Sequence, residues 1–255
     1  MAKTAAVSSI QVIDRVTALL EAITSHMEPA SLKYLSAETQ LHPSTAFRIL
    51  NALAMHGLVE RTSAGRYALG MKLLRFGSHV HGKVDLLREA RPIMEWLRSQ
   101  VGETVNLTVR EGDEVVYIER VIPNRMMRVE QVIGSRAPLH VTAVGKLFLS
   151  EGDEKTCREY ARRTGLPRYT PNTLTQVTKL WGQLETARKH GYALDDEEAE
   201  QGVSCIGVPV RDRHRIMIAG LSISAPRERR QSSWINLIKK AGTDLSARLG
   251  YTTSA

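Results

Sequence analysis

The first 70 residues place three helical patterns directly before a hairpin signal, and few small folds share that order. Apolar residues at helical spacing predict an amphipathic helix over 9–24. Ser31 is a suitable N-cap for a short second helix, and Gln40 stands in a turn where a left-handed residue is expected. A third helix is predicted over 43–56, and Gly57 is a usual residue after a helix end. Strand-forming residues on both sides of a Ser-Ala-Gly turn then predict the hairpin.

The predicted third helix separates an apolar face from a polar face. The inward face is expected to hold Phe47, Leu50, Leu53 and Ala54. The opposite face carries Ser44, Thr45, Arg48 and, at i+7 or i+8, Asn51 or Ala52. Hydroxyls and amides can bind phosphates and arginine can reach a base edge, so this face suits a DNA major groove. With Arg61 and Arg66 at the hairpin tip, residues 1–70 are predicted to form a winged helix-turn-helix DNA-binding domain.

Charge is distributed unevenly along the chain, which carries a formal net charge of +8. Residues 39–84 hold a single acidic residue, Glu60, and six basic ones: Arg48, Arg61, Arg66, Lys72, Arg75 and Lys83. Each Lys or Arg that docks on a phosphate backbone releases condensed counterions, so double-stranded DNA is the first partner to expect. The alternative is a small helical module whose basic face binds an acidic protein. Weak salt dependence of DNA binding would favour that alternative.

Length and composition are compatible with two domains or one large one, and with a soluble protein. A chain of 255 residues is long enough for two domains, and no apolar run approaches the ~20 residues that a membrane helix needs. The N-terminus has no sustained apolar stretch of the kind a signal peptide requires. Two cysteines, Cys157 and Cys205, are too few for a disulfide framework. We therefore predict a cytoplasmic protein with no membrane partner.

Residues 71–84 are predicted to form a linker helix, weakened by Gly77 and Gly82. His79 and His81 are two positions apart and would point to different helix faces. We therefore expect solvated histidines at these positions and no metal site.

Residues 85–255 alternate strand pairs with helices, which indicates an α+β sheet domain. Helices are predicted over 86–101, 140–149, 154–164, 173–190 and 230–249. Strands are predicted over 104–109, 115–121, 206–210 and 216–224, with a further extended stretch over about 126–133.

Two segments of this domain could bind an ion or a ligand. The loop at 142–145 offers small side chains and the unpaired amides of a helix N-terminus, which suit a carboxylate. A tightly packed helix start is the alternative interpretation. The four carboxylates from Asp195 to Glu198 could bind a divalent metal, but such a run more often opens a helix. No nearby Cys or His spacing supports a metal.

A third segment combines a thiol with two hydroxyls. Ser222 and Ser224 are two positions apart, so on a strand they share one face. Cys205 could be a nucleophile, but it has no Gly-x-Ser-x-Gly context and no obvious base nearby. A buried structural thiol is the simpler interpretation.

Several separated motifs occur in order along the chain: LHPSTAFRIL at 41–50, GLV at 57–59, YALG at 67–70, PLH at 138–140, GK at 145–146, GYALDDEE at 191–198, GVSCI at 202–206 and LSIS at 221–224. They resemble the signature segments of the IclR family of bacterial transcriptional regulators. The resemblance covers about residues 9–250.

The resemblance implies that residues 85–255 form a GAF-like effector-binding domain that senses a small organic molecule. Carried over residue by residue, it implies an effector pocket formed by Ala143, Val144, Asp195, Cys205, Ser222 and Ser224. Ala143 stands where relatives often have glycine, and Val144 is bulkier than the common alanine, so both narrow the expected pocket. Family members are dimers or pairs of dimers on pseudo-palindromic sites, so a homodimer or homotetramer is expected here.

We therefore predict a ligand-responsive, DNA-binding transcriptional regulator with no cofactor and no metal. The helix N-terminus and the paired hydroxyls favour a small carboxylate effector, aromatic acids included. Asp195 beside an anion must be solvated, protonated or bonded to a ligand hydroxyl or N–H, so a hydroxy acid or an acyl compound bearing a donor is expected. The alternative function is an enzyme of the C-terminal domain that uses Cys205 and carries an appended DNA-binding head.

Overall fold

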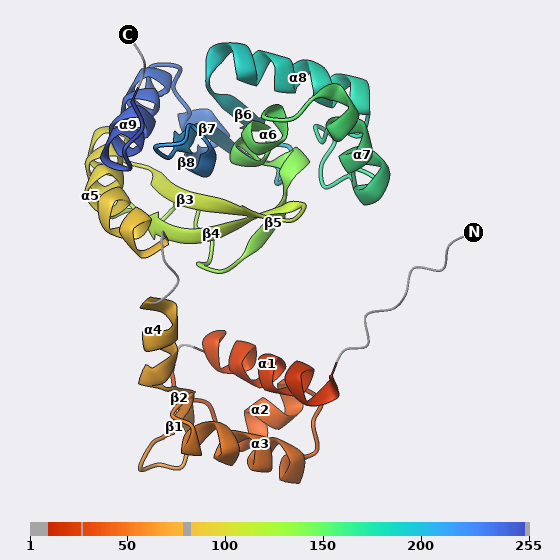
Figure 1. Cartoon of the computed structure of the whole chain (residues 1–255), viewed down its shortest axis with the longest axis vertical. Coiled ribbons are helices and arrows are strands. Elements are labelled where there is room, and N and C mark those ends of the chain that lie inside the picture. Colours follow the sequence, from red (N-terminus) through yellow and green to blue (C-terminus); the bar gives the residue numbers. More distant parts are fainter. Residues whose placement is uncertain (1–9, 27, 79–82, 253–255) are drawn as a thin grey trace. The chain divides into compact units, whose positions relative to one another are not determined.

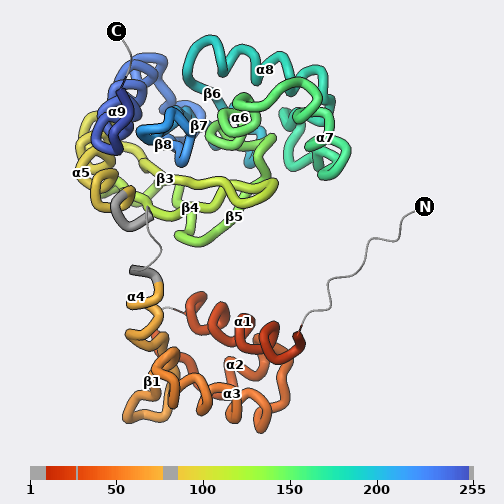
Figure 2. Tube along the Cα trace, viewed as in Figure 1, coloured from red at the N-terminus to blue at the C-terminus, as the bar shows by residue number. Residues whose placement is uncertain are grey.

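The computed structural model describes residues 10–26, 28–78 and 83–252, and the chain divides into two compact units, Met1–Val84 and Asp85–Ala255. Figures 1 and 2 show a group of helices with a small hairpin beside them in the first unit, and helices on both faces of a sheet in the second. This confirms the predicted fold class, a winged helix-turn-helix before an α+β domain. Within the described ranges, no helix is both long and apolar enough to cross a membrane.

The first unit is built on three helices that enclose an aliphatic core. Its elements are α1 (Gln11–Thr24), α2 (Leu32–Glu38), α3 (Pro43–Met55), β1 (Val59–Arg61), β2 (Tyr67–Leu69) and α4 (Met71–Ser78). Ser31 caps α2 as predicted, because its hydroxyl accepts from Tyr34 N at 3.2 Å. Gln40 has φ 55°, the left-handed conformation expected in the turn before α3. The core joins the helices to the hairpin through Leu19, Ile23, Leu35, Leu50, Val59 and Tyr67.

Helix α3 differs from the prediction in the residues that it buries. Ala46, Leu50 and Leu53 lie in the core, whereas Phe47 is 38% exposed and Ala54 is only partly buried. The inward placement of Phe47 was therefore wrong. The core packs against the side of α3 that carries Ala46, Leu50 and Leu53. Successive residues are rotated by about 100° around a helix, so Phe47, the neighbour of Ala46, points away from this core.

The predicted hairpin is present, with β1 antiparallel to β2. Gly65 closes its turn at φ 75°, a conformation that favours glycine. An isolated bridge between Ala30 and Tyr67 ties the hairpin to the segment before α2. The predicted linker is helical over α4, and α5 begins at Lys83. Residues 79–82, which include the two linker histidines, lie outside the described residues.

The second unit is a six-stranded antiparallel sheet between two layers of helices. Its helices are α5 (Lys83–Val101), α6 (Ala143–Ser150), α7 (Glu154–Thr164), α8 (Val177–His190) and α9 (Trp234–Arg248), with 3₁₀ helices η1 (Leu139–Val141) and η2 (Arg227–Arg229). Its strands are β3 (Thr104–Glu111), β4 (Glu114–Val121), β5 (Arg136–Pro138), β6 (Ala193–Asp196), β7 (Val203–Arg211) and β8 (Met217–Pro226). The order across the sheet is β5-β4-β3-β8-β7-β6.

Successive side chains of the central strands point to opposite faces of this sheet, so each face has its own set of residues. One face packs against α5 and α9 through an aliphatic core that includes Leu107 of β3 and Leu221 of β8. The other face lies under α6, α7 and α8 (Figure 1). Asn106 and Ser222, the neighbours of those leucines along the strands, pair with each other and face this second layer. The polar positions of the central strands therefore gather beneath α6.

Several predicted elements differ from the structure, and the helices predicted over 173–190 and 230–249 begin only at Val177 and Trp234. The 126–133 stretch is not a strand, because β4 ends at Val121 and the next pairing begins only at Arg136. The acidic run does not open a helix, since Asp195 and Asp196 belong to edge strand β6, which pairs with β7. The helix predicted over 140–149 begins at Ala143, after η1.

Two glycines let α6 lie directly on the sheet. A Cβ at Gly207 would come within 3.1 Å of Val144 N, and a Cβ at Gly220 would overlap the Val144 side chain. Because both positions lack side chains, the first turn of α6 sits against β7 and β8. This contact places the start of α6 at the centre of the sheet.

Candidate DNA-binding surface and effector pocket

The polar face of α3 is open at the positions predicted to read DNA. Ser44 and Arg48 are exposed, and Thr45 and Asn51 are half-buried. His42 caps the helix, because its Nδ1 accepts from Ser44 N at 3.4 Å and lies 2.8 Å from Ser44 Oγ. Arg48 forms no ion pair within the described residues, so its guanidinium is available to a base edge or a phosphate.

The hairpin tip presents the two predicted arginines on its exposed surface. The guanidinium carbon of Arg61 lies 5.8 Å from the centre of the Tyr67 ring, a cation–π distance that orients the charge. Arg66 donates from Nη1 to the Pro29 carbonyl at 3.4 Å. Glu60 accepts from Met71 N at 3.3 Å, so the single acid of segment 39–84 is engaged at the start of α4.

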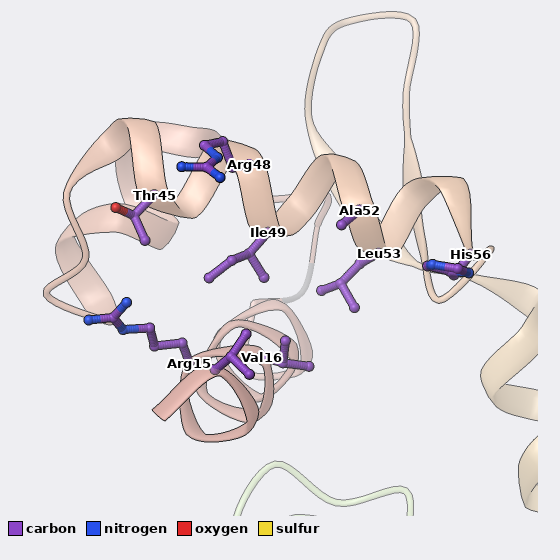
Figure 3. Close-up of a pocket in the computed structure, with 9 residues that line it drawn as sticks. Arg15, Val16, Thr45, Arg48, Ile49, Ala52, Leu53 and His56 are labelled. Carbon is purple, nitrogen blue, oxygen red and sulfur yellow. The ribbon is translucent and has the colours of Figure 1, made fainter. Parts of the chain in front are cut away.

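A groove of about 370 Å³ lies between α1 and α3. Figure 3 shows Thr45 and Arg48 near one end of it and Ala52 and His56 towards the other, with Arg15 of α1 near Thr45. Arg15 was not predicted as a site residue. The sequence does contain a signal for it. Arg15 lies next to the apolar stripe of α1, and a residue at the edge of such a stripe lies beside the helix that the stripe packs against.

The second unit contains a small cavity between α6 and the sheet, with a volume of about 70 Å³. The side chains around it include Thr108, Tyr117, Gln131, Thr142, Ala143, Val144, Asp195, Cys205 and Ser222. Five of the six predicted effector residues therefore surround one cavity. The sixth, Ser224, lies beneath it, with its Oγ 3.2 Å from Cys205 Sγ.

The first turn of α6 borders this cavity, because Thr142, Ala143 and Val144 line it. Thr142 caps the helix by accepting from Gly145 N at 3.1 Å, and the next amide, Lys146 N, donates to Thr142 O at 3.0 Å. Ala143 and Val144 precede these bonds, so their N–H groups have no partner within the helix. The positive end of the helix dipole adds to these donors and favours an anion.

A row of polar side chains crosses the sheet under the cavity. Asp195 is the cross-strand partner of Cys205, and Cys205 is the partner of Ser224. Ser222 and Tyr117 line the cavity, and their hydroxyls make no hydrogen bond within the part of the chain that the structure describes. Two hydroxyls are therefore available to a ligand, next to the helix amides.

Burial is the largest influence on the pKa values of Asp195 and Cys205. It raises the pKa of Asp195 to about 6, while the N–H of Glu198, 2.8 Å from Asp195 Oδ1, and the charge of Lys146 act in the opposite direction. Burial also raises the pKa of the Cys205 thiol well above its usual range. A nucleophilic cysteine needs a lowered pKa, so this environment speaks against the enzymatic alternative.

A buried ion pair supports the cavity from behind. Lys146 of α6 and Glu198 have side chains that are only 1% and 4% exposed, with Nζ 2.5 Å from Oε1. Gln183 of α8 accepts a second hydrogen bond from Nζ at 2.8 Å. Lys146 thus links α6 to Gln183 of α8 and to Glu198, and the N–H of Glu198 donates to Asp195.

Sequence reasoning missed several residues that line the cavity, among them Thr108, Tyr117 and Gln131. One signal was present in β3, where polar residues alternate with Val105 and Leu107 at positions 104, 106 and 108. A buried strand with one polar face indicates a site beneath that face. Gln131 belongs to the loop between β4 and β5, and no local pattern marks it.

A winged helix-turn-helix followed by a sheet domain with a cavity under α6 is the architecture of a ligand-responsive transcriptional regulator. The "IclR helix-turn-helix domain" matches residues 12–63, and the "Bacterial transcriptional regulator IclR C-terminal" domain matches residues 78–247. The chain belongs to the IclR family.

Individual relatives agree with this assignment along nearly the whole chain. The transcriptional regulator KdgR of Escherichia coli K12 is 32% identical over 248 residues, which cover 95% of this chain and 94% of KdgR. The solved IclR of Thermotoga maritima has a TM-score of 0.78 at 30% identity and covers 95% of this chain and 100% of its own. An IclR homolog from Microbacterium hydrocarbonoxydans, complexed with 4-hydroxybenzoate, has a TM-score of 0.82 at 25% identity, covering 93% and 98%.

Proposed function

We propose that this regulator binds a pseudo-palindromic operator through α3 and the hairpin and senses a small aliphatic hydroxy acid in the cavity under α6. The observation that carries the effector half is the cavity itself, which the N-terminus of α6 lines together with two residues whose hydroxyls are free of partners within the described residues, Tyr117 and Ser222. Amides and hydroxyls bind a carboxylate without a buried positive charge. The six predicted DNA-binding residues, Ser44, Thr45, Arg48, Asn51, Arg61 and Arg66, are proposed to contact the duplex.

The volume of the cavity argues for a small effector. A cavity of roughly 150 Å³ holds benzene, so about 70 Å³ suits an acid of roughly two to four carbons. The sequence also allowed aromatic acids as effectors, and the cavity volume restricts the proposal to small aliphatic acids. Val144, held against Gly220, supports the same limit, because its side chain fills the space above β8. The Microbacterium homolog is complexed with a larger acid that also combines a carboxylate with a hydroxyl.

We further propose that the chain acts as a homodimer or a pair of dimers in the cytoplasm, where its operator is accessible. Two-fold symmetry in the protein would place two half-sites about one helical turn apart, or a multiple of that spacing. A non-enzymatic role is proposed for the second unit, since the Cys205 thiol is buried and burial raises its pKa well above its usual range.

Thermal unfolding with a panel of small molecules tests the effector class. Glycolate and lactate are expected to raise the Tm, and benzoate, glycolamide and ethanolamine are not. At 100 times Kd the stabilisation would be about 2.7 kcal/mol. Ser222→Val should abolish the shift by filling the cavity, whereas Ser232→Val, at an exposed serine, should keep it. Stabilisation by only neutral or cationic compounds would rule out the acid.

Effector binding is expected to weaken as the pH rises through about 6. The folded-state pKa of Asp195 lies above its ordinary value of 3.8, so the buried carboxyl is neutral below about pH 6 and negative above it. An ionised Asp195 repels the effector anion, which is itself fully charged throughout this range. Asp195→Asn should bind with nearly constant affinity. Calorimetric titrations of both proteins between about pH 5 and pH 8 test this, and equally flat profiles would contradict it.

A further inference from the structure

The groove between α1 and α3 borders the face of α3 that is proposed to read bases. Thr45, Arg48 and Ala52 line the groove from α3, and their spacing of three and four residues places them on one side of that helix. Arg15 lines it from α1, and Figure 3 shows its side chain near Thr45. A partner that covers this side of α3 therefore also meets Arg15.

The charge around this groove is positive. Its lining includes Arg15, Arg48 and His56 and, among the described residues, no carboxylate. Neither guanidinium forms an ion pair with another described residue. Asp14, the acid next to Arg15 in the sequence, does not line the groove, because successive residues are rotated by about 100° around a helix. Two guanidiniums on one concave surface without a carboxylate favour an anionic partner.

The dimensions of a DNA duplex place phosphates on both sides of a bound helix. The major groove is about 12 Å wide and a helix with its side chains is about 10–12 Å across, so a helix that enters the groove fills it. Side chains from the elements beside that helix then meet the sugar-phosphate backbone along the groove. Arg15 belongs to such an element, since α1 and α3 line the same groove of the protein.

We propose that Arg15 of α1 binds a backbone phosphate beside the base that Arg48 reads, which makes α1 part of the DNA-binding surface. This inference rests on the proposed function and adds a contact outside α3 and the hairpin. A phosphate carries no sequence information, so Arg15 contributes affinity and no base preference. The contact releases condensed counterions, so Arg15 accounts for about 0.9 of the slope of log affinity against log salt.

Fluorescence anisotropy of the full chain with a duplex from the region upstream of the gene tests this contact. Arg15→Met should weaken binding to this duplex and to its single-base variants by the same factor. The advantage of the wild type over Arg15→Met should shrink about three- to fourfold between 50 and 200 mM salt, because one phosphate contact is lost. Arg15→Lys keeps the charge and should retain most of the affinity. Arg162→Met removes an equal charge from an exposed position on α7 and should bind like the wild type.

The outcomes separate failure of this contact from failure of the proposed function. Arg15 is half-buried and makes no hydrogen bond with another described residue, so Arg15→Met and Arg15→Gln should both fold with the Tm of the wild type. If the wild type binds the duplex and both variants keep its affinity and salt slope, the contact is wrong and the regulator stands. A loss of affinity with a changed oligomeric state in sedimentation would show that the groove holds a second copy of the chain, which also overturns the contact. If the wild type binds no duplex, both proposals are wrong.

Discussion

Lys146→Met is expected to destabilise the second unit by about 3–5 kcal/mol, because it leaves the carboxylate of Glu198 buried without its positive partner. Both side chains are almost fully enclosed, so water cannot replace the lost charge. The second oxygen of Glu198 already lacks a hydrogen-bond partner within the described residues, which leaves no spare contact to absorb the change. Lys146 also lowers the pKa of Asp195, so its removal should raise that pKa further.

Urea unfolding followed by tryptophan fluorescence measures this loss. Trp96, Trp181 and Trp234 all belong to the second unit, so the signal reports on that unit. The double variant Lys146→Met/Glu198→Leu should recover most of the stability, since it removes the unpaired charge as well. Arg158→Met, which breaks a pair with side chains 56% and 49% exposed, should have an effect below about 1 kcal/mol. A Lys146→Met effect as small as that of Arg158→Met would contradict the account.

Arg48→Ala is expected to weaken operator binding by about 1–3 kcal/mol and to relax the preference at one base position. Arg48 is the exposed cation in the middle of the polar face of α3, and no acid within the described residues pairs with it. Arg48→Lys should retain much of the affinity but lose base preference, because an ammonium cannot bond a guanine edge in the bidentate manner of a guanidinium.

A wing variant provides the comparison for Arg48. Arg61→Gln removes an exposed charge at the hairpin and should weaken binding equally for all sequences, with a salt slope smaller by about one. Fluorescence anisotropy with a duplex from the region upstream of the gene, and with single base substitutions in it, separates the two behaviours. If Arg48→Ala changes neither affinity nor base preference, Arg48 does not read a base.

Local signals in the sequence located most elements of the first unit. Ser31 and Gly57 mark helix boundaries through their own backbone and side-chain chemistry, so they can be interpreted without knowledge of the fold. Whether Phe47 is buried or exposed could not be predicted from such local signals. A helix with apolar residues at 46, 47, 49, 50, 53 and 54 has a broad apolar arc, and only packing against the other helices decides which part is enclosed.

The proposed effector pocket depends on pairings between distant strands. The resemblance indicated Asp195, Cys205 and Ser222, and the sheet register brings them to one face. Asp195 belongs to a strand only because β7 pairs with it, which the local charge pattern does not reveal. Gln131 reaches the cavity from a loop that lacks strand pairing, held by side chains about 10 to 30 residues away in sequence. Such contacts are tertiary, and neither propensity nor periodicity reports them.

The most direct test measures operator affinity against salt with and without a bound hydroxy acid. We expect the affinity of the wild type for the upstream duplex to fall by about 1,000-fold or more between 50 and 200 mM salt, since the basic face of the first unit is proposed to bind phosphates. At fixed salt, saturating glycolate or lactate should change the Kd by about fivefold or more, and Ser222→Val should remove that change. Affinity that is insensitive to salt, or a Kd that no acid alters, would contradict a regulator that reads DNA through α3 and responds to an acid under α6.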